Sequence, residues 1–159
     1  MRKEKLIGRL KTLYSLEFIN AFFLPFIFLT YCYVHDESVG LNSLSALTLY
    51  GILLLEGSYF WFSVSRQLRT TNLNDLKKTF KRLKTINLVL ILIEIMFIII
   101  HPFNGTWDMY GTLLFLSLAV LEHVNYFEFQ LMYDNKNDLI YLRQYGRLKK
   151  SKLKRILTK

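Results

Sequence analysis

Four glutamates stand out in this 159-residue chain, because each lies inside a long apolar stretch. The stretches and their glutamates are residues 12–34 (Glu17), 44–65 (Glu56), 86–103 (Glu94) and 110–133 (Glu122). An apolar stretch of about 18 or more residues can cross the hydrocarbon core of a bilayer as a helix. A carboxylate inside such a helix is costly unless a partner, a proton or a cation neutralises it, so it marks a candidate functional site.

Polar residues recur at a fixed interval along the third stretch. Asn87, Glu94 and His101 are each separated by seven residues. Seven residues are close to two helical turns, so the three side chains project from one side with a drift of about 20° per step. This line predicts either hydrogen bonds that hold neighbouring helices together or a row of groups along a proton or ion pathway.

Depth in the membrane groups the carboxylates further. At a rise of 1.5 Å per residue, the distance from the Lys- and Arg-flanked end of the stretch to its glutamate is about 12–15 Å for Glu56, Glu94 and Glu122. We therefore expect these three to share one layer near the middle of the membrane and to bind protons or a cation. Glu17 and Glu128 are expected in a second layer, nearer that end.

The fourth stretch carries the densest set of polar side chains. Glu122, Asn125 and Tyr126 share one helical face, whereas His123 and Glu128 project in other directions. We expect His123, and His101 of the third stretch, to act as relay partners of the mid-depth carboxylates. The secondary candidates are six further polar residues of the four stretches: Glu17, Asn20, Asn87, Asn125, Tyr126 and Glu128.

Metal centres and cofactors are not predicted. The Glu-x-x-His pairs that hold metals in di-iron helical bundles do not occur in the chain. The chain also lacks Cys-x-x-Cys, H-E-x-x-H, G-x-S-x-G and Gly-rich phosphate-loop motifs.

The distribution of charge predicts the topology. All 21 Lys and Arg lie before the first stretch, between the second and third, or after the fourth. The connections at 35–43 and 102–109 contain none and carry acidic residues instead. Because cytoplasmic segments are enriched in Lys and Arg, we expect an all-α, antiparallel four-helix bundle in the cytoplasmic (plasma) membrane, with both termini in the cytoplasm.

The predicted organisation has two parts. Residues 1–133 are expected to form the transmembrane domain, and residues 134–159 a basic cytoplasmic tail. The segment at about residues 72–85 is amphipathic, and we expect it either to lie on the membrane surface or to extend the third span. The basic segments are expected to contact anionic lipid headgroups. Nucleic acid is not an expected partner, since no module for reading grooves or stacking bases is visible.

A glutamate early in the first of four spans is similar to the arrangement in the small multidrug-resistance exporters. This chain is longer, has larger connections and lacks the Gly-rich packing of that family, so the resemblance is confined to Glu17.

Three function classes follow from these patterns. The first is a small proton- or cation-coupled transporter that uses intramembrane carboxylates, with homo-oligomerisation expected because four short spans enclose little volume. The second is a non-catalytic accessory, immunity or regulatory subunit that docks another membrane protein. The third is a membrane-embedded enzyme that modifies lipids, with Glu122 and His123 as its acid–base pair.

Overall fold

Helices make up nearly the whole of the structure, a computed structural model that describes residues 2–67, 74–131 and 136–157. The six helices are α1 (Arg2–Val34), α2 (Leu41–Gln67), α3 (Asn74–Ile100), α4 (Thr106–Phe127), α5 (Lys136–Tyr145) and α6 (Lys152–Leu157). No strand occurs in the described ranges, apart from one isolated bridge between Phe129 and Lys150. The predicted all-α class is confirmed.

Three of the helices are long and apolar enough to cross a membrane, within Ile7–Val34, Leu41–Arg66 and Lys77–Ile100. They point to an integral membrane protein. The fourth expected span corresponds to α4, which does not meet the same test of length and composition.

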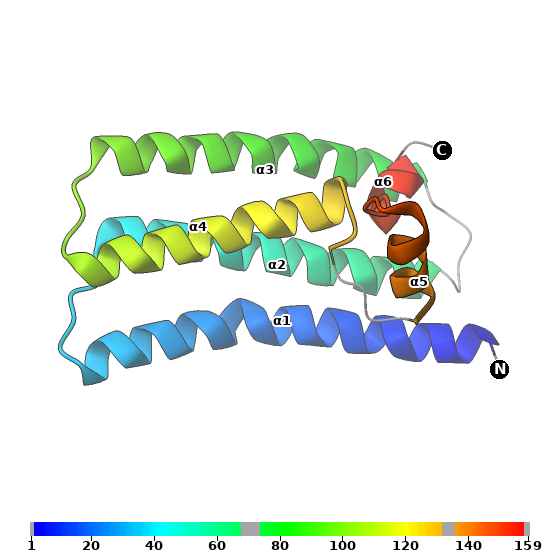
Figure 1. Ribbon diagram of the computed structural model, residues 1–159, viewed down its shortest axis with the longest axis horizontal. Coiled ribbons are helices and arrows are strands. Elements are labelled where there is room, and N and C mark those ends of the chain that lie inside the picture. Colours follow the sequence, from blue (N-terminus) through cyan, green and yellow to red (C-terminus); the bar gives the residue numbers. More distant parts are fainter. Residues whose placement is uncertain (1, 68–73, 132–135, 158–159) are drawn as a thin grey trace.

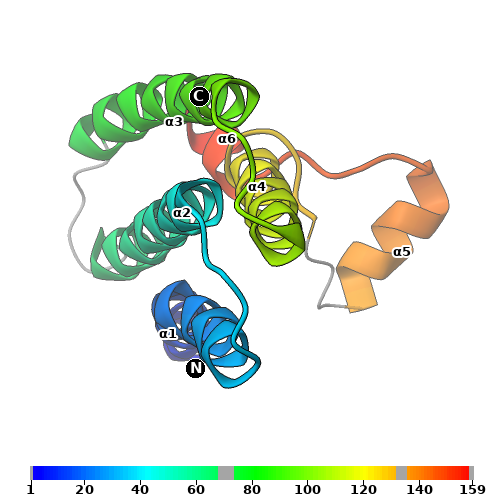
Figure 2. The ribbon, with the colours of Figure 1, turned by 90° about the vertical axis from the view of Figure 1, so that its left-hand side faces the viewer.

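The four long helices lie side by side with α2 in the centre (Figure 1). Helix α2 packs against α1, α3 and α4, and α3 also packs against α4. Viewed along the helices, α1 and α3 lie on opposite sides of α2 (Figure 2). The central position of α2 explains its burial: half of its apolar segment is buried, against 11% for α1 and for α3. The outer helices therefore present apolar side chains to their surroundings, as lipid-facing helices do.

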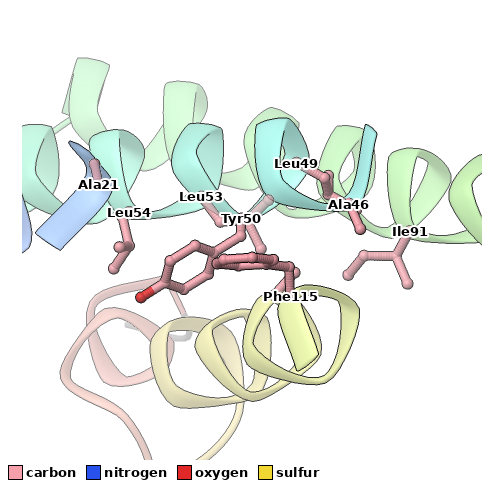
Figure 3. Packing of buried hydrophobic residues seen from close by; sticks show 9 residues of the cluster. Ala21, Ala46, Leu49, Tyr50, Leu53, Leu54, Ile91 and Phe115 are labelled. Atoms are coloured by element: carbon pink, nitrogen blue, oxygen red, sulfur yellow. The ribbon is translucent and has the colours of Figure 1, made fainter. Parts of the chain in front are cut away.

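Helix α4 buries one face against its neighbours. Its buried residues recur every three or four positions: Asp108, Gly111, Thr112, Phe115, Ala119, His123, Tyr126 and Phe127. This spacing places them on a single stripe of the helix. Figure 3 shows the centre of the resulting core, where the rings of Tyr50 and Phe115 fill the space between α2 and α4. The Tyr50 hydroxyl points away from Ile91 in this view.

Charge divides the two ends of the molecule. The α1–α2 and α3–α4 connections lie at one end, which we call the acidic end because it carries Asp36, Glu37 and Asp108 (Figure 1). The start of α1, the end of α2, the start of α3 and helices α5 and α6 lie at the other end, which we call the basic end. The described Lys and Arg are all at or near this basic end.

The tail folds back onto the basic end. Leu153 of α6 packs into a cluster with Phe60, Phe80, Tyr126 and Phe127. Helix α5 stands to the side of the long helices (Figure 2).

Helix α4 ends at Phe127, earlier than the expected stretch to residue 133. Ser151 donates from its hydroxyl to the Tyr126 carbonyl at 2.5 Å and from its backbone N–H to the Glu128 carbonyl at 3.1 Å. The tail therefore satisfies carbonyls that a further helical turn would have used.

Helix α3 continues the third span toward the basic end without a break. The amphipathic segment expected over 72–85 forms the first turns of this helix from Asn74 onward. Residues 72 and 73 lie outside the described residues.

Candidate functional site

Three consecutive residues of α2 reach three neighbouring helices. The Glu56 carboxylate accepts a hydrogen bond from Asn87 Nδ2 of α3 at 2.5 Å. The Ser58 hydroxyl donates to the Tyr14 carbonyl of α1 at 2.8 Å. Gly57, between them, faces α4 and α1. This divergence follows from the turn of about 100° per residue and from the central position of α2.

Gly57 makes room for two polar side chains. A methyl group placed on Gly57 would overlap the Tyr126 hydroxyl and would lie 2.7 Å from Glu17 Oε2. A tyrosine of α4 and a glutamate of α1 therefore meet at the surface of α2, and only glycine leaves space for both.

The two oxygens of the Glu17 carboxylate have different surroundings. Oε1 accepts a hydrogen bond from Trp61 Nε1 of α2 at 2.8 Å. Oε2 lies beside the Tyr126 hydroxyl at the Gly57 surface. Glu17 Oε2 and the Tyr126 hydroxyl oxygen are both buried, and the two groups interact with each other without an ideal hydrogen-bond geometry. A buried polar atom that is poorly satisfied costs up to roughly 1–3 kcal/mol, so this contact is a candidate binding group.

A second carboxylate and a second tyrosine extend this cluster. Glu122 interacts electrostatically with Glu17, and Tyr50 with Glu122. Tyr126 interacts with all three. We call Glu17, Tyr50, Glu122 and Tyr126, together with the Gly57 surface, the glutamate–tyrosine cluster. It joins α1, α2 and α4.

The other two mid-depth carboxylates have separate partners. Glu56 is bound by Asn87, and Glu94 accepts a hydrogen bond from the Ser45 hydroxyl of α2 at 2.8 Å. Both pairs link α2 to α3. These contacts correspond to interhelical hydrogen bonding, the first of the two alternatives for the polar line on α3. The structure brings Glu122 together with Glu17 rather than with Glu56 or Glu94.

The expected relay histidines lie apart from the cluster. His101 is exposed at the acidic end, where its ring stacks on Phe97 with the centroids 4.0 Å apart. His123 is buried near the basic end, and its electrostatic neighbours are Lys84 and Glu128. Glu122 and His123 therefore face different neighbours.

The secondary candidates occupy varied positions. Glu128 lies beyond the end of α4 and forms ion pairs with Lys84 and Lys154. These lysines lower the pKa of Glu128, Lys154 more than Lys84, by hydrogen bonding to the carboxylate. Asn125 donates to Glu122 at 3.4 Å and accepts from the Leu131 backbone.

Asn20 is exposed on α1. Among the residues that the structure describes, no group of three or more His, Cys, Asp or Glu is arranged to hold a metal ion.

A half-buried lysine connects the cluster to the basic end. The Lys152 ammonium of α6 lies over the Trp61 ring, 5.3 Å from its centroid. Burial lowers the pKa of Lys152, and the nearby charges of Arg155 and Arg9 lower it further. Since Trp61 also binds Glu17, a chain of contacts runs from the tail to the glutamate–tyrosine cluster.

The acidic end contains a polar site that the sequence did not single out. Asp108, at the start of α4, is fully buried. It accepts hydrogen bonds from the backbone N–H groups of Ser43 at 2.9 Å and Asn104 at 2.8 Å. Burial opposes the charged form of Asp108, but these donors outweigh it and lower its pKa below the ordinary value of 3.8. Asp108 thus caps α2 and fixes the α3–α4 connection.

Three residues in or beside the cluster do not stand out in the sequence. Gly57, Trp61 and Tyr50 resemble ordinary residues of an apolar helix. Gly57 lies four residues before Trp61, so both project from one side of α2. A glycine next to an intramembrane glutamate was the available signal, since small residues mark close helix contacts in membranes.

Comparison with known proteins identifies no relative of this chain. No protein-family model matches this chain, and no match was found among curated proteins or solved structures.

Proposed function

We propose that α4 is a fourth membrane span and that both termini lie in the cytoplasm. The 19 residues of α4 that follow Asp108 extend about 28 Å at 1.5 Å per residue, close to the thickness of a hydrocarbon core of about 30 Å. Thr112, His123 and Tyr126 are polar residues of this segment that are buried against other helices, so it needs less apolar character than α1 or α3. The clustering of Lys and Arg at the basic end supports the cytoplasmic assignment of that end.

We further propose that the protein is a small proton- or cation-coupled transporter whose binding group is the glutamate–tyrosine cluster. The observation that carries this proposal is the adjacency of Glu17 Oε2 and the Tyr126 hydroxyl, both buried and in contact with each other without a hydrogen bond of full geometry. A proton or a small cation bound between them would complete the coordination of both oxygens. Glu122 supplies a second carboxylate for transfer.

This proposal changes the ranking of the carboxylates. Glu56 and Glu94 are each bound by a polar side chain of the facing helix, so we assign them to helix association. Glu17, a secondary candidate from sequence, becomes the primary one.

Aromatic rings separate the cluster from the acidic end. Phe115 packs edge-on against Phe28 of α1 at 5.3 Å and against Tyr50 of α2 at 5.7 Å, measured between ring centroids. Passage of an ion toward the acidic end would require these rings to move, which is a conformational step of the alternating-access kind.

Proton uptake into proteoliposomes under an imposed membrane potential tests the transporter proposal. We expect uptake by the natural protein and its loss in Glu17→Gln and in Tyr126→Phe. Glu94→Gln is the matched control, because a glutamine carbonyl can still accept the Ser45 hydrogen bond, and it should retain uptake. Equal loss in Glu94→Gln and Glu17→Gln, or no uptake by the natural protein with protons or monovalent cations, would overturn the proposal.

A second candidate function is that of an accessory subunit of another membrane protein. It is favoured by the apolar segments of α1 and α3, of which only 11% is buried. Such faces suit lipid or a partner helix. Purification in mild detergent after cross-linking in the membrane is expected to yield a stoichiometric partner under this alternative, and repeated recovery of the protein alone would count against it.

A further inference from the structure

An apolar groove runs along the line where α1 and α2 meet. Its larger part has a volume of 820 Å³ and includes Phe18, Phe22 and Phe26 of α1 and Ile52 and Leu55 of α2 among its lining residues. A second part of 480 Å³ shares Phe18, Ile19 and Leu55 with the first. The two parts are therefore continuous, and each has a volume typical of a ligand site.

Small residues form the bottom of the groove and rings form its sides. Ala21, Gly51 and Thr48 are among its lining residues. A methyl group on Gly51 would lie 3.5 Å from the Ala21 carbonyl oxygen, which is ordinary contact, so the helices are close here. Phe22 and Phe26 are more than half exposed. The groove thus opens outward, where the surroundings of a membrane protein are lipid chains.

The lining of the groove becomes more polar toward the basic end. Its second part includes polar groups of both helices: Tyr14, Ser15, Ser58 and Tyr59. Lys11 precedes Tyr14 and Ser15 by three and four residues, so it lies on the same face of α1 one turn nearer the basic end. Arg66 follows Phe62, another lining residue, by four residues on α2.

Helices α1 and α2 run in opposite directions (Figure 1). Lys11, near the start of α1, and Arg66, near the end of α2, therefore flank the same end of the groove. The groove is therefore apolar along its length, hydroxyl-bearing near one end and positively charged at its mouth.

We propose that this groove binds one anionic phospholipid, with an acyl chain between α1 and α2 and the phosphate near Lys11 and Arg66. The order of groups along the groove matches the order along such a lipid: hydrocarbon, polar glycerol region, charged headgroup. The lined part of α1 from Tyr14 to Leu29 extends about 22 Å at 1.5 Å per residue. That exceeds half of a hydrocarbon core of about 30 Å, so a chain from the leaflet at the basic end fits within it.

Native mass spectrometry of the full-length protein tests this inference. The protein is stripped of lipid in detergent and then titrated with phosphatidylglycerol or, separately, with phosphatidylcholine of the same acyl chains. We expect one phosphatidylglycerol to bind, with phosphatidylcholine weaker. Lys11→Gln should weaken phosphatidylglycerol binding about fivefold, the effect of one Lys or Arg near an anionic headgroup. Lys81→Gln, an exposed lysine of α3 at the same end, is its matched control and should bind as the natural protein does.

A second pair of variants tests the acyl-chain site. Leu55→Trp fills the region shared by both parts of the groove and should abolish the one-lipid peak for both lipids. Leu88→Trp places the same substitution on an exposed position of α3 and should leave it unchanged.

Three results would overturn the proposal. The first is equal affinity for the two lipids in the natural protein. The second is equal loss in Leu55→Trp and Leu88→Trp. The third is a lipid-free dimer that dissociates on Leu55→Trp, which would assign the groove to a second copy of the chain. The inference does not depend on transport, because the readout is lipid binding alone.

Discussion

Two glycines, Gly40 just before α2 and Gly57 within it, each receive a polar side chain of α4, yet the two contacts differ in one respect. At the acidic end, a methyl group on Gly40 would overlap the Asp108 carboxylate, just as one on Gly57 would overlap the Tyr126 hydroxyl. Asp108 accepts backbone hydrogen bonds from Ser43 and Asn104. The Tyr126 hydroxyl and the neighbouring Glu17 Oε2 have no hydrogen bond of full geometry among the described residues.

The difference separates a structural contact from a candidate binding group. Asp108 supplies the acceptors that water would otherwise provide to two backbone N–H groups, so it stabilises the start of α2 and the α3–α4 connection. The oxygens of the Glu17–Tyr126 contact are also buried, but their hydrogen bonding is incomplete. Proteins retain such groups where another species binds or where strain is used, and this is why we assign function to one contact and stability to the other.

The largest effect on stability is expected at Asp108. Asp108→Ala leaves the buried N–H of Ser43 and the partly buried N–H of Asn104 without their acceptor, and we expect a loss of about 2–3 kcal/mol in the free energy of unfolding. Glu37→Ala, an exposed acidic residue of the same end, is the control and should change stability by less than about 0.5 kcal/mol. Denaturation in detergent micelles measures both. Similar losses in the two variants would remove the distinction between the acidic-end site and ordinary surface acids.

A smaller loss of stability, together with a loss of uptake, is expected at Gly57. Gly57→Ala forces the Tyr126 hydroxyl away from Glu17, and overpacking of this kind costs about 1–3 kcal/mol. Proton uptake should be lost in the same variant. Gly51→Ala is the control on the same helix, because its added methyl group meets only ordinary contact; we expect it to retain uptake and to be as stable as the natural protein or slightly more so.

Adding Tyr126→Ala to Gly57→Ala sharpens this test. The second substitution removes both the hydroxyl and the ring carbon that the new methyl group overlaps, so the double variant should be less destabilised than the sum of the two single losses, without regaining uptake. Additive losses in the double variant would show that Tyr126 does not lie against Gly57.

The sequence predicted the helices better than their contacts. Apolar length alone identified the segments that become α1, α2 and α3, because spanning a hydrocarbon core imposes a minimum run of apolar residues. The end of α4 at Phe127 was not predictable in this way. It depends on Ser151, more than twenty residues later in the chain, which binds the last carbonyls of the helix.

The candidate site shows the same limit. The intramembrane glutamates were visible as costly residues, but depth along a helix gave no information on which neighbour each would face. Glu56 and Glu122 were placed in one layer by depth, whereas the structure turns Glu56 toward α3 and Glu122 toward α1 and α2. The facing directions follow from which helices pack together, and a single sequence does not specify that packing.

The smallest expected effect is a dependence of stability on pH at the acidic end. The pKa of Asp108 is lower in the folded protein than its ordinary value of 3.8. A group of this kind stabilises the fold fully above its unfolded pKa, and its contribution is lost as the pH falls through its folded pKa. At pH values below about 3.8, the denaturation midpoint of the natural protein should therefore decrease relative to that of Asp108→Asn. The decrease should be smaller than the loss in Asp108→Ala, because a protonated carboxyl group still accepts hydrogen bonds through its carbonyl oxygen. Parallel profiles for the natural protein and Asp108→Asn across this range would show that Asp108 is not held charged by its backbone donors.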